Sequence, residues 1–236
     1  MFSYLYSTII FNPLYNGLIF LFDKFTWLDA GLAVIIFTII VRLILFPLSR
    51  KAVITQVKMK EIEPELNRLK QTVPDRQQQA LMVMELYKKK GVNPFSSFLL
   101  LFLQLPIIYA LYSIFIRSGL PSVKEELLYK GLVSVPHIDM HFLGAFDISM
   151  PSIALSVIAA LAQFLQLQFS VSANSAPSQD PAQNMMKNMK YVFPIVIFFI
   201  SYKISAVVAV YWTVSSLFTL VQELVVRRHI ARHEAY

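Results

Sequence analysis

Long apolar segments alternate with polar ones along the chain, and this pattern predicts membrane-spanning helices. Four nearly uncharged stretches approach or exceed the about 20 residues that a helix needs to cross about 30 Å of hydrocarbon. With one shorter apolar stretch they predict five spans, at residues 29–49, 95–116, 148–171, 185–203 and 204–224. The first span carries one charge inside its apolar run, that of Arg42.

The last two spans allow two interpretations, because residues 191–202 give only 12 apolar positions, or about 18 Å of helix. Residues 191–224 form either one long helix or a hairpin that turns at Lys203, with the fourth span starting near Met185. The hairpin places fifteen lysines and arginines on one side of the membrane and five on the other. The positive-inside rule therefore favours five spans, with the N-terminus outside and the C-terminus in the cytosol.

Residues 11–26, which precede the first span, mix apolar side chains with Asn, Asp, Lys, Pro and Gly. This composition predicts an amphipathic helix lying in the outer membrane interface. The alternative is a sixth span. We find no internal repeat and expect residues 1–236 to form a single domain.

Residues 51–92 form the only sizeable polar insert, and their apolar positions recur at helical spacing. The first predicted stripe consists of Ile62, Leu66, Leu69 and Val73, and the second of Ala80, Met84 and Tyr87. Pro74–Asp75 predicts a turn between two helices, and Gly91 suits the end of the second one. We expect a basic, antiparallel helical hairpin in the cytosol, which is either a solvated connector or a working part of the protein.

Composition supports a membrane protein, since 56% of residues are hydrophobic and 15% are charged, against about 25% charged in soluble domains. The chain contains no cysteine, which excludes disulfides, thiolate metal sites and thiol catalysis. His137 and His141 have a metal-compatible spacing, but only Asp139 lies near them in the sequence. We expect no metal, no cofactor and no small-molecule substrate, and without a phosphate loop or nucleophile elbow we expect no enzyme.

Arg42 is the most informative residue, because its guanidinium stays charged and costs about 2.5–3.5 kcal/mol at the centre of a bilayer. The apolar runs contain no carboxylate to pair with it, since Glu223 falls at the end of the last span. Water in a polar cavity would satisfy this charge and attract acidic or polar peptide segments. Residues that could line such a cavity, although each alone also suits helix packing, are Thr38, Gln104, Gln163, Gln166, Gln168, Tyr211, Trp212, Ser215 and Ser216.

The chain also resembles the YidC/Oxa/Alb family of membrane-protein insertases, in particular its bacterial YidC core. The resemblance rests on stretches that follow the family's order from the first span onward. They are IIVRLILFPLSRKA (39–52), KMKEIEPELNRLK (58–70), LYKKKGVNPFSSFLLLFLQLPIIYALY (86–112), FLQLQFS (164–170), DPAQNMMKNMKYVFPIVIFF (180–199) and VYWTVSSLFTLVQE (210–223). Residues 201–205, SYKIS, lack the proline and glycine of the family's turn between the last two spans.

The resemblance implies an all-α integral membrane protein whose five transmembrane helices enclose a hydrophilic groove open to the cytosol and the lipid. Arg42 would lie at the groove's centre, and the family's groove positions correspond to Thr38, Gln166, Trp212 and the neighbouring Tyr211. Gln104 completes our expected substrate-binding set. Hairpin 51–92 would match the family's region for substrate capture.

The implied function is insertion and folding of nascent membrane proteins in the bacterial plasma membrane, alone or with the Sec translocon. The implied partners are the lipid bilayer, the ribosome and the signal recognition machinery, with loop 172–190 matching the family's region for ribosome and targeting contacts. A small channel or transporter subunit, and a non-catalytic assembly scaffold, are the alternatives. A transporter would normally show a repeat or paired intramembrane charges, and neither is present.

Overall fold

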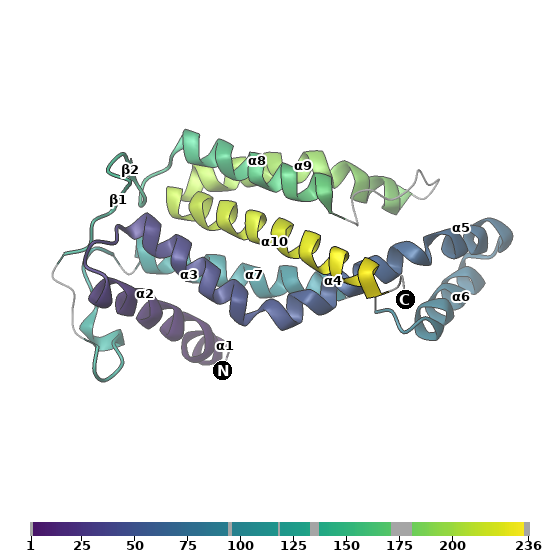
Figure 1. The fold of residues 1–236 in the computed structure, drawn as a ribbon, viewed down its shortest axis with the longest axis horizontal. Helices are drawn as coiled ribbons and strands as arrows, with labels where there is room; N and C mark the ends of the chain where they lie inside the picture. Colours follow the sequence, from purple (N-terminus) through teal and green to yellow (C-terminus); the bar gives the residue numbers. More distant parts are fainter. Residues whose placement is uncertain (1, 94–95, 118, 133–136, 171–180, 234–236) are drawn as a thin grey trace.

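The computed structural model describes residues 2–93, 96–117, 119–132, 137–170 and 181–233 as an elongated bundle of helices (Figure 1). Most helices run along the length of the molecule. Loops and a two-stranded sheet lie at one end, and a pair of short helices projects from the other. We refer to these as the outer and inner ends, following the orientation expected from the charge distribution.

The N-terminal segment is a continuous helix made of α1 (Phe2–Tyr6), a π-helical turn η1 (Ser7–Phe11) and α2 (Asn12–Lys24). It starts nine residues before the predicted helix 11–26, because the apolar residues before Phe11 contain no helix-breaking residue. Pro13 follows this π-helical turn, and it has no backbone N–H to donate to the hydrogen bonds of a regular helix. Residues Tyr4–Lys24 are long and apolar enough to cross a membrane, which suits the sixth-span alternative by length and composition.

The next two helices, α3 (Ala30–Ile44) and α4 (Phe46–Glu61), meet at a 66° bend. Asp29 caps α3 by accepting a 2.8 Å hydrogen bond from the N–H of Leu32. Because of the bend, predicted span 29–49 is not one straight helix: α3 ends at Ile44, and Ser49 already lies in α4. Pro47 lies in the first turn of α4, where its missing N–H is tolerated and a new helix direction can begin.

Two short helices, α5 (Glu63–Thr72) and α6 (Arg76–Lys89), follow α4 and lie side by side at the inner end (Figure 1). Asp75 caps α6, and Gly91 follows it with φ of +63°, a conformation that glycine adopts without strain. Ile62 and Leu66 are buried, together with Val92. The second predicted stripe is partly wrong, because Ala80 is exposed and Met84 is 57% exposed.

The face of α6 that packs against α5 instead consists of Val83, Leu86 and Tyr87. Only Tyr87 of the second predicted stripe belongs to it. The sequence of α6 carries apolar residues on more than one face, and α5 covers only the face with Val83, Leu86 and Tyr87.

The chain returns toward the outer end through α7 (Ser96–Tyr112), which a π-helical turn η2 (Ser113–Arg117) extends. The outer segment then contains a 3-10 turn η3 (Glu125–Leu127) and an antiparallel pair of strands, β1 (His141–Phe142) and β2 (Phe146–Asp147). Buried Asn16 holds part of this segment on α2, because its side chain bonds both the carbonyl of Leu127 and the N–H of Tyr129.

The third predicted span began too early, since α8 covers Ile153–Phe169 rather than starting at residue 148. The N–H of Ile148 donates to the carbonyl of Met140 and thereby continues the strand pair. Pro151 follows, and Ser152 caps the helix by accepting from the N–H of Leu155. The apolar run extends past the helix because Ile148, in this outer turn, is itself buried.

The last two helices, α9 (Pro181–Ile204) and α10 (Ala206–His233), are separated at Ser205 and pack against each other in opposite directions (Figure 1). The structure thus contains the hairpin rather than one helix through Lys203. Both helices are longer than predicted: α9 begins at Pro181, and α10 continues nine residues past Leu224. The sequence that follows Leu224, VVRRHIARH, has no glycine or proline to end it.

Helix α10 is the centre of the bundle, since it packs against α3, α4, α7, α8 and α9. Its first residues are the most deeply buried, and Ala206, Val207 and Ala209 have no exposed surface. Residues Ala206–Ile230 are long and apolar enough to cross a membrane, and the bent pair of α3 and α4 qualifies if it is counted as one span. Gln104–Arg117 and Ile153–Phe169 are shorter apolar helices.

Candidate functional site

A small cleft, partly open to its surroundings, lies beside Arg42. Helices α3, α4, α7 and α10 contribute to its wall. The lining residues are Thr38, Val41, Arg42, Leu45, Ser49, Gln104, Ile107 and Tyr211. Four of the six residues expected to bind substrate, namely Arg42, Thr38, Gln104 and Tyr211, therefore share one cleft.

Arg42 reaches across the cleft from α3 to α7, where its Nη2 donates a 3.2 Å hydrogen bond to Oε1 of Gln104. Among the residues that the structure describes, no carboxylate lies within ion-pairing distance of this guanidinium. The neutral amide of Gln104 satisfies one donor and leaves the positive charge uncompensated. The cleft is thus cationic, and the remaining guanidinium donors can serve water or an acceptor that enters.

Thr38 and Tyr211, the other two expected binding residues that line the cleft, have different roles. Thr38 is 1% exposed, and its hydroxyl donates a 2.6 Å bond to the carbonyl of Val34 on its own helix. It contributes a small surface to the cleft rather than a free donor. Tyr211 is 3% exposed and contributes an aromatic ring from α10 to the wall of the cleft.

Gln166 and Trp212 lie outside this cleft, in a polar network between α8 and α10. The indole Nε1–H of Trp212 and the hydroxyl of Ser216 both donate to Oε1 of Gln163, at 2.8 and 3.0 Å. Gln163 in turn donates a 2.7 Å bond from Nε2 to Oε1 of Gln166. Because Gln163 is 5% and Trp212 6% exposed, this network joins two helices rather than lining an open space.

The same seam ends in a charged cluster at the inner end of α10. Glu223 is 3% exposed, accepts a 3.4 Å bond from Ser170 and pairs with Arg227 at 3.4 Å. Arg227 also donates to the carbonyl of Phe169, at the last residue of α8. Sequence reasoning placed Glu223 at the end of a span, whereas the longer α10 buries it inside the bundle.

Sequence reasoning also missed a polar contact at the bend between α3 and α4. Gln222 of α10 is 4% exposed, and its Nε2 donates a 2.6 Å bond to the hydroxyl of Ser49. The same nitrogen lies 3.5 Å from the carbonyl of Phe46. A polar residue two positions after Pro47 was the available signal, since prolines leave backbone groups that neighbouring helices satisfy.

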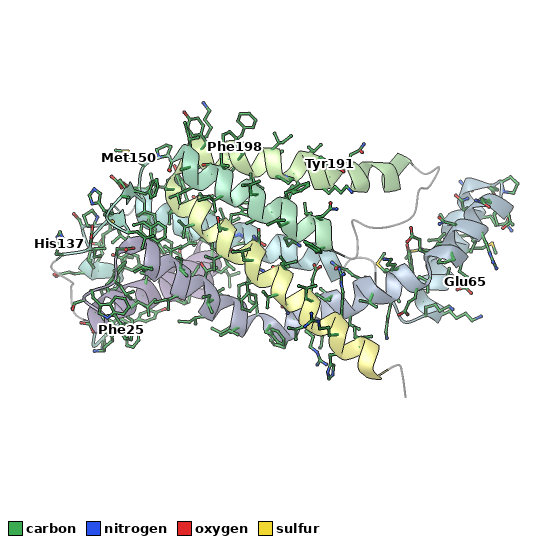
Figure 2. All side chains as sticks on the ribbon, turned by 45° about the horizontal axis from the view of Figure 1, so that its top comes forward. Phe25, Glu65, His137, Met150, Tyr191 and Phe198 are labelled. Carbon is green, nitrogen blue, oxygen red and sulfur yellow. The ribbon has the colours of Figure 1, made fainter. Side chains whose placement is uncertain are left out.

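His137, in the outer segment, lies at the end of the molecule opposite Glu65 (Figure 2). His141 and Asp139 lie 3.3 Å apart, and both are exposed. The N–H of His141 donates to the Asp139 carboxylate and lowers the pKa of that group. Within the described residues, no group of three metal-ligating side chains occurs.

The fold is that of a helical membrane protein with a small cleft beside Arg42 among its helices. The sequence profile of the 60Kd inner membrane protein family matches residues 21–233. The chain belongs to this family, the YidC/Oxa family of inner membrane proteins.

Relatives include "Membrane protein insertase YidC" of Fusobacterium nucleatum, which is 33% identical over 91% of this chain and 95% of that protein. The protein of the same name from Oceanobacillus iheyensis is 31% identical over 84% of this chain and 74% of its own length. A solved structure, "Active YidC insertase crystal structure with the first transmembrane domain resolved", matches with a TM-score of 0.57 and 23% identity. This likeness in fold covers 89% of the chain and 45% of the solved one.

Proposed function

We propose that the protein inserts nascent membrane proteins into the bacterial inner membrane and helps them fold, using the Arg42 cleft as the entry site for polar segments. The observation that carries this proposal is the uncompensated Arg42 guanidinium, bonded only to a neutral amide among the described side chains. The names of the relatives, membrane protein insertase YidC, agree with it.

The chemistry of the cleft favours the polar flank of a substrate. A guanidinium in a low-dielectric environment attracts carboxylates and backbone carbonyls more strongly than it would in water. The cleft therefore lowers the cost of moving an acidic or polar tail away from the cytosol. Burial of the substrate's apolar segment in lipid then supplies the driving force, so this step needs no nucleotide.

The packing of α10 supports an exit route into lipid. Helices α7 and α9 both pack on α10, yet within the described part of the chain they share no extensive contact with each other. An apolar segment whose polar flank rests near Arg42 would leave the cleft between these two helices. The groove required by this route would be open to the cytosol and to lipid, with the protein's N-terminus outside and its C-terminus inside.

The hairpin of α5 and α6 would meet the substrate before the cleft does. It lies at the inner end, and α6 exposes Leu81, Met82 and Met84 beside a run of lysines. Exposed methionines adapt to different apolar partners. The ribosome, the signal recognition machinery and the Sec translocon are the partners that would deliver or share such substrates.

Reconstitution tests the proposed function directly. Purified protein in liposomes is offered a single-span substrate with a short translocated tail, and the protease-protected tail is measured. We expect more protection than in liposomes without protein. Equal protection in the two preparations would overturn the insertase proposal, and an accompanying solute or ion flux would instead indicate a channel.

A further inference from the structure

The bend between α3 and α4 determines the shape of the cleft beside Arg42. Arg42 lies three residues before Leu45, where α3 gives way to α4 at 66°. Leu45 and Ser49, on the two sides of Pro47, both line the cleft. Any change in the bend therefore moves one wall of the cleft relative to the guanidinium.

The bend keeps backbone hydrogen bonds on both sides, from the N–H of Leu45 to the carbonyl of Val41 and from the N–H of Ser49 to the carbonyl of Leu45, both at 3.0 Å. Pro47 supplies no N–H, and the hydroxyl of Ser49 donates to its own chain at the carbonyls of Leu45 and Phe46, both at 3.1 Å. Side chains that bond back to their own helix tend to bend it. A contact from another helix can add to these bonds and hold the angle.

Helix α10 provides such a contact through Gln222. Its Nε2 reaches Ser49 Oγ at 2.6 Å, and the amide is almost fully buried. The same helix carries Tyr211, which also lines the cleft. One helix thus contributes a residue to the cleft wall and contacts the bend that positions Leu45 and Ser49.

We propose that Gln222 is a positioning residue for insertion: through Ser49 it fixes the bend between α3 and α4 and so holds Arg42 in its place in the cleft. This inference rests on the proposed function of the cleft. Gln222 acts through the bend and does not itself line the cleft.

The test compares Gln222→Leu and Ser49→Ala, which remove the two sides of one hydrogen bond, with Thr219→Val. Thr219 lies one turn earlier on α10 and donates to the carbonyl of Ser215 on its own helix; among the described residues it bonds to no other helix, so it is a matched control. We expect each of the first two variants to slow insertion about three- to tenfold, the range of one interhelical hydrogen bond. The double variant should be no slower than the slower single one.

A distance measurement separates positioning from a general loss of structure. The chain has no cysteine, so spin labels can be placed at Lys58→Cys on α4 and Arg228→Cys on α10 without further changes. We expect a narrow distance distribution in the unmodified protein and in Thr219→Val, and a broad one in Gln222→Leu and Ser49→Ala. A distribution as narrow in Gln222→Leu as in the control would overturn the inference.

The Arg42→Ala background provides the second decisive readout. If Gln222 acts by positioning Arg42, Gln222→Leu should change the remaining insertion rate little in that background. The same three- to tenfold loss would show a role independent of Arg42 and refute the inference. Should Arg42→Ala alone leave insertion unchanged, the proposed role of the cleft fails, while the distance measurement still decides whether Gln222 fixes the bend.

Discussion

Replacing Gln163 by leucine tests whether the polar seam between α8 and α10 stabilises the bundle. The change removes the acceptor of two interhelical hydrogen bonds, from Trp212 Nε1 at 2.8 Å and from Ser216 Oγ at 3.0 Å. Trp212 and Ser216 are 6% and 4% exposed, so water does not readily replace the lost partner.

The magnitude follows from the two lost bonds and the orphaned indole. Interhelical hydrogen bonds in membranes average about 0.6 kcal/mol and reach about 1.7 kcal/mol, and an unsatisfied buried donor costs about 1–3 kcal/mol. We therefore expect Gln163→Leu to lower the free energy of unfolding by about 2 kcal/mol. Leu165→Ala, at a position on α8 that is 45% exposed, is the control and should cost less than about 0.5 kcal/mol.

The assay is equilibrium unfolding in mixed micelles, followed by far-ultraviolet circular dichroism. Trp212→Phe keeps an aromatic ring but removes the N–H, so it isolates one bond of the network. In a double-mutant cycle we expect Gln163 and Trp212 to show a coupling free energy of about 1 kcal/mol. A coupling below about 0.3 kcal/mol would refute the reasoning, because independent sites are additive to within that amount.

Three other predictions concern parts of the molecule outside this seam. Leu66→Ala should open the small core between α5 and α6 at a local cost of about 2–4 kcal/mol, so amide hydrogen exchange should rise in that hairpin and not in α8. Gly31→Ala would place a methyl group 2.2 Å from the Phe142 ring; unfolding measurements should show a loss of stability that Phe142→Ala partly restores. Ser3→Cys should react with an impermeant maleimide from outside intact cells, and Lys60→Cys only after permeabilisation; labelling of Ser3→Cys from the inside alone would instead make Tyr4–Lys24 a sixth span.

The apolar pattern identified where helices lie but not where each one starts and stops. The predicted start of α8 at residue 148 was wrong because Ile148 is buried by strand pairing, and burial looks the same in a sequence whether a strand or a helix provides it. Helix α6 shows a related limit of prediction from spacing. Met84 falls on a stripe at helical spacing, yet α5 covers only the face with Val83, Leu86 and Tyr87.

The residues of the site were predictable to the extent that their chemistry is unusual for a membrane. An arginine among apolar side chains is visible in any sequence, and Thr38 one helical turn away follows from geometry. Gln104 and Tyr211 join them only through the packing of α7 and α10. The same packing places Gln166 and Trp212 in the polar network between α8 and α10. It also joins Ser49 to Gln222, two residues that are 173 positions apart in the sequence.

The most direct test of the account compares Arg42→Ala and Arg42→Lys in liposomes, using two substrates whose translocated tails are either acidic or uncharged. One charge about 12 Å from the Arg42 guanidinium is worth about 1.4 kcal/mol at an effective dielectric constant of about 20, or about a tenfold change in rate. We predict that Arg42→Ala slows insertion of the acidic tail about tenfold more than that of the uncharged one, and that Arg42→Lys retains much of the rate. Insertion of the acidic tail by Arg42→Ala at the unmodified rate would contradict the claim that this charge receives the substrate.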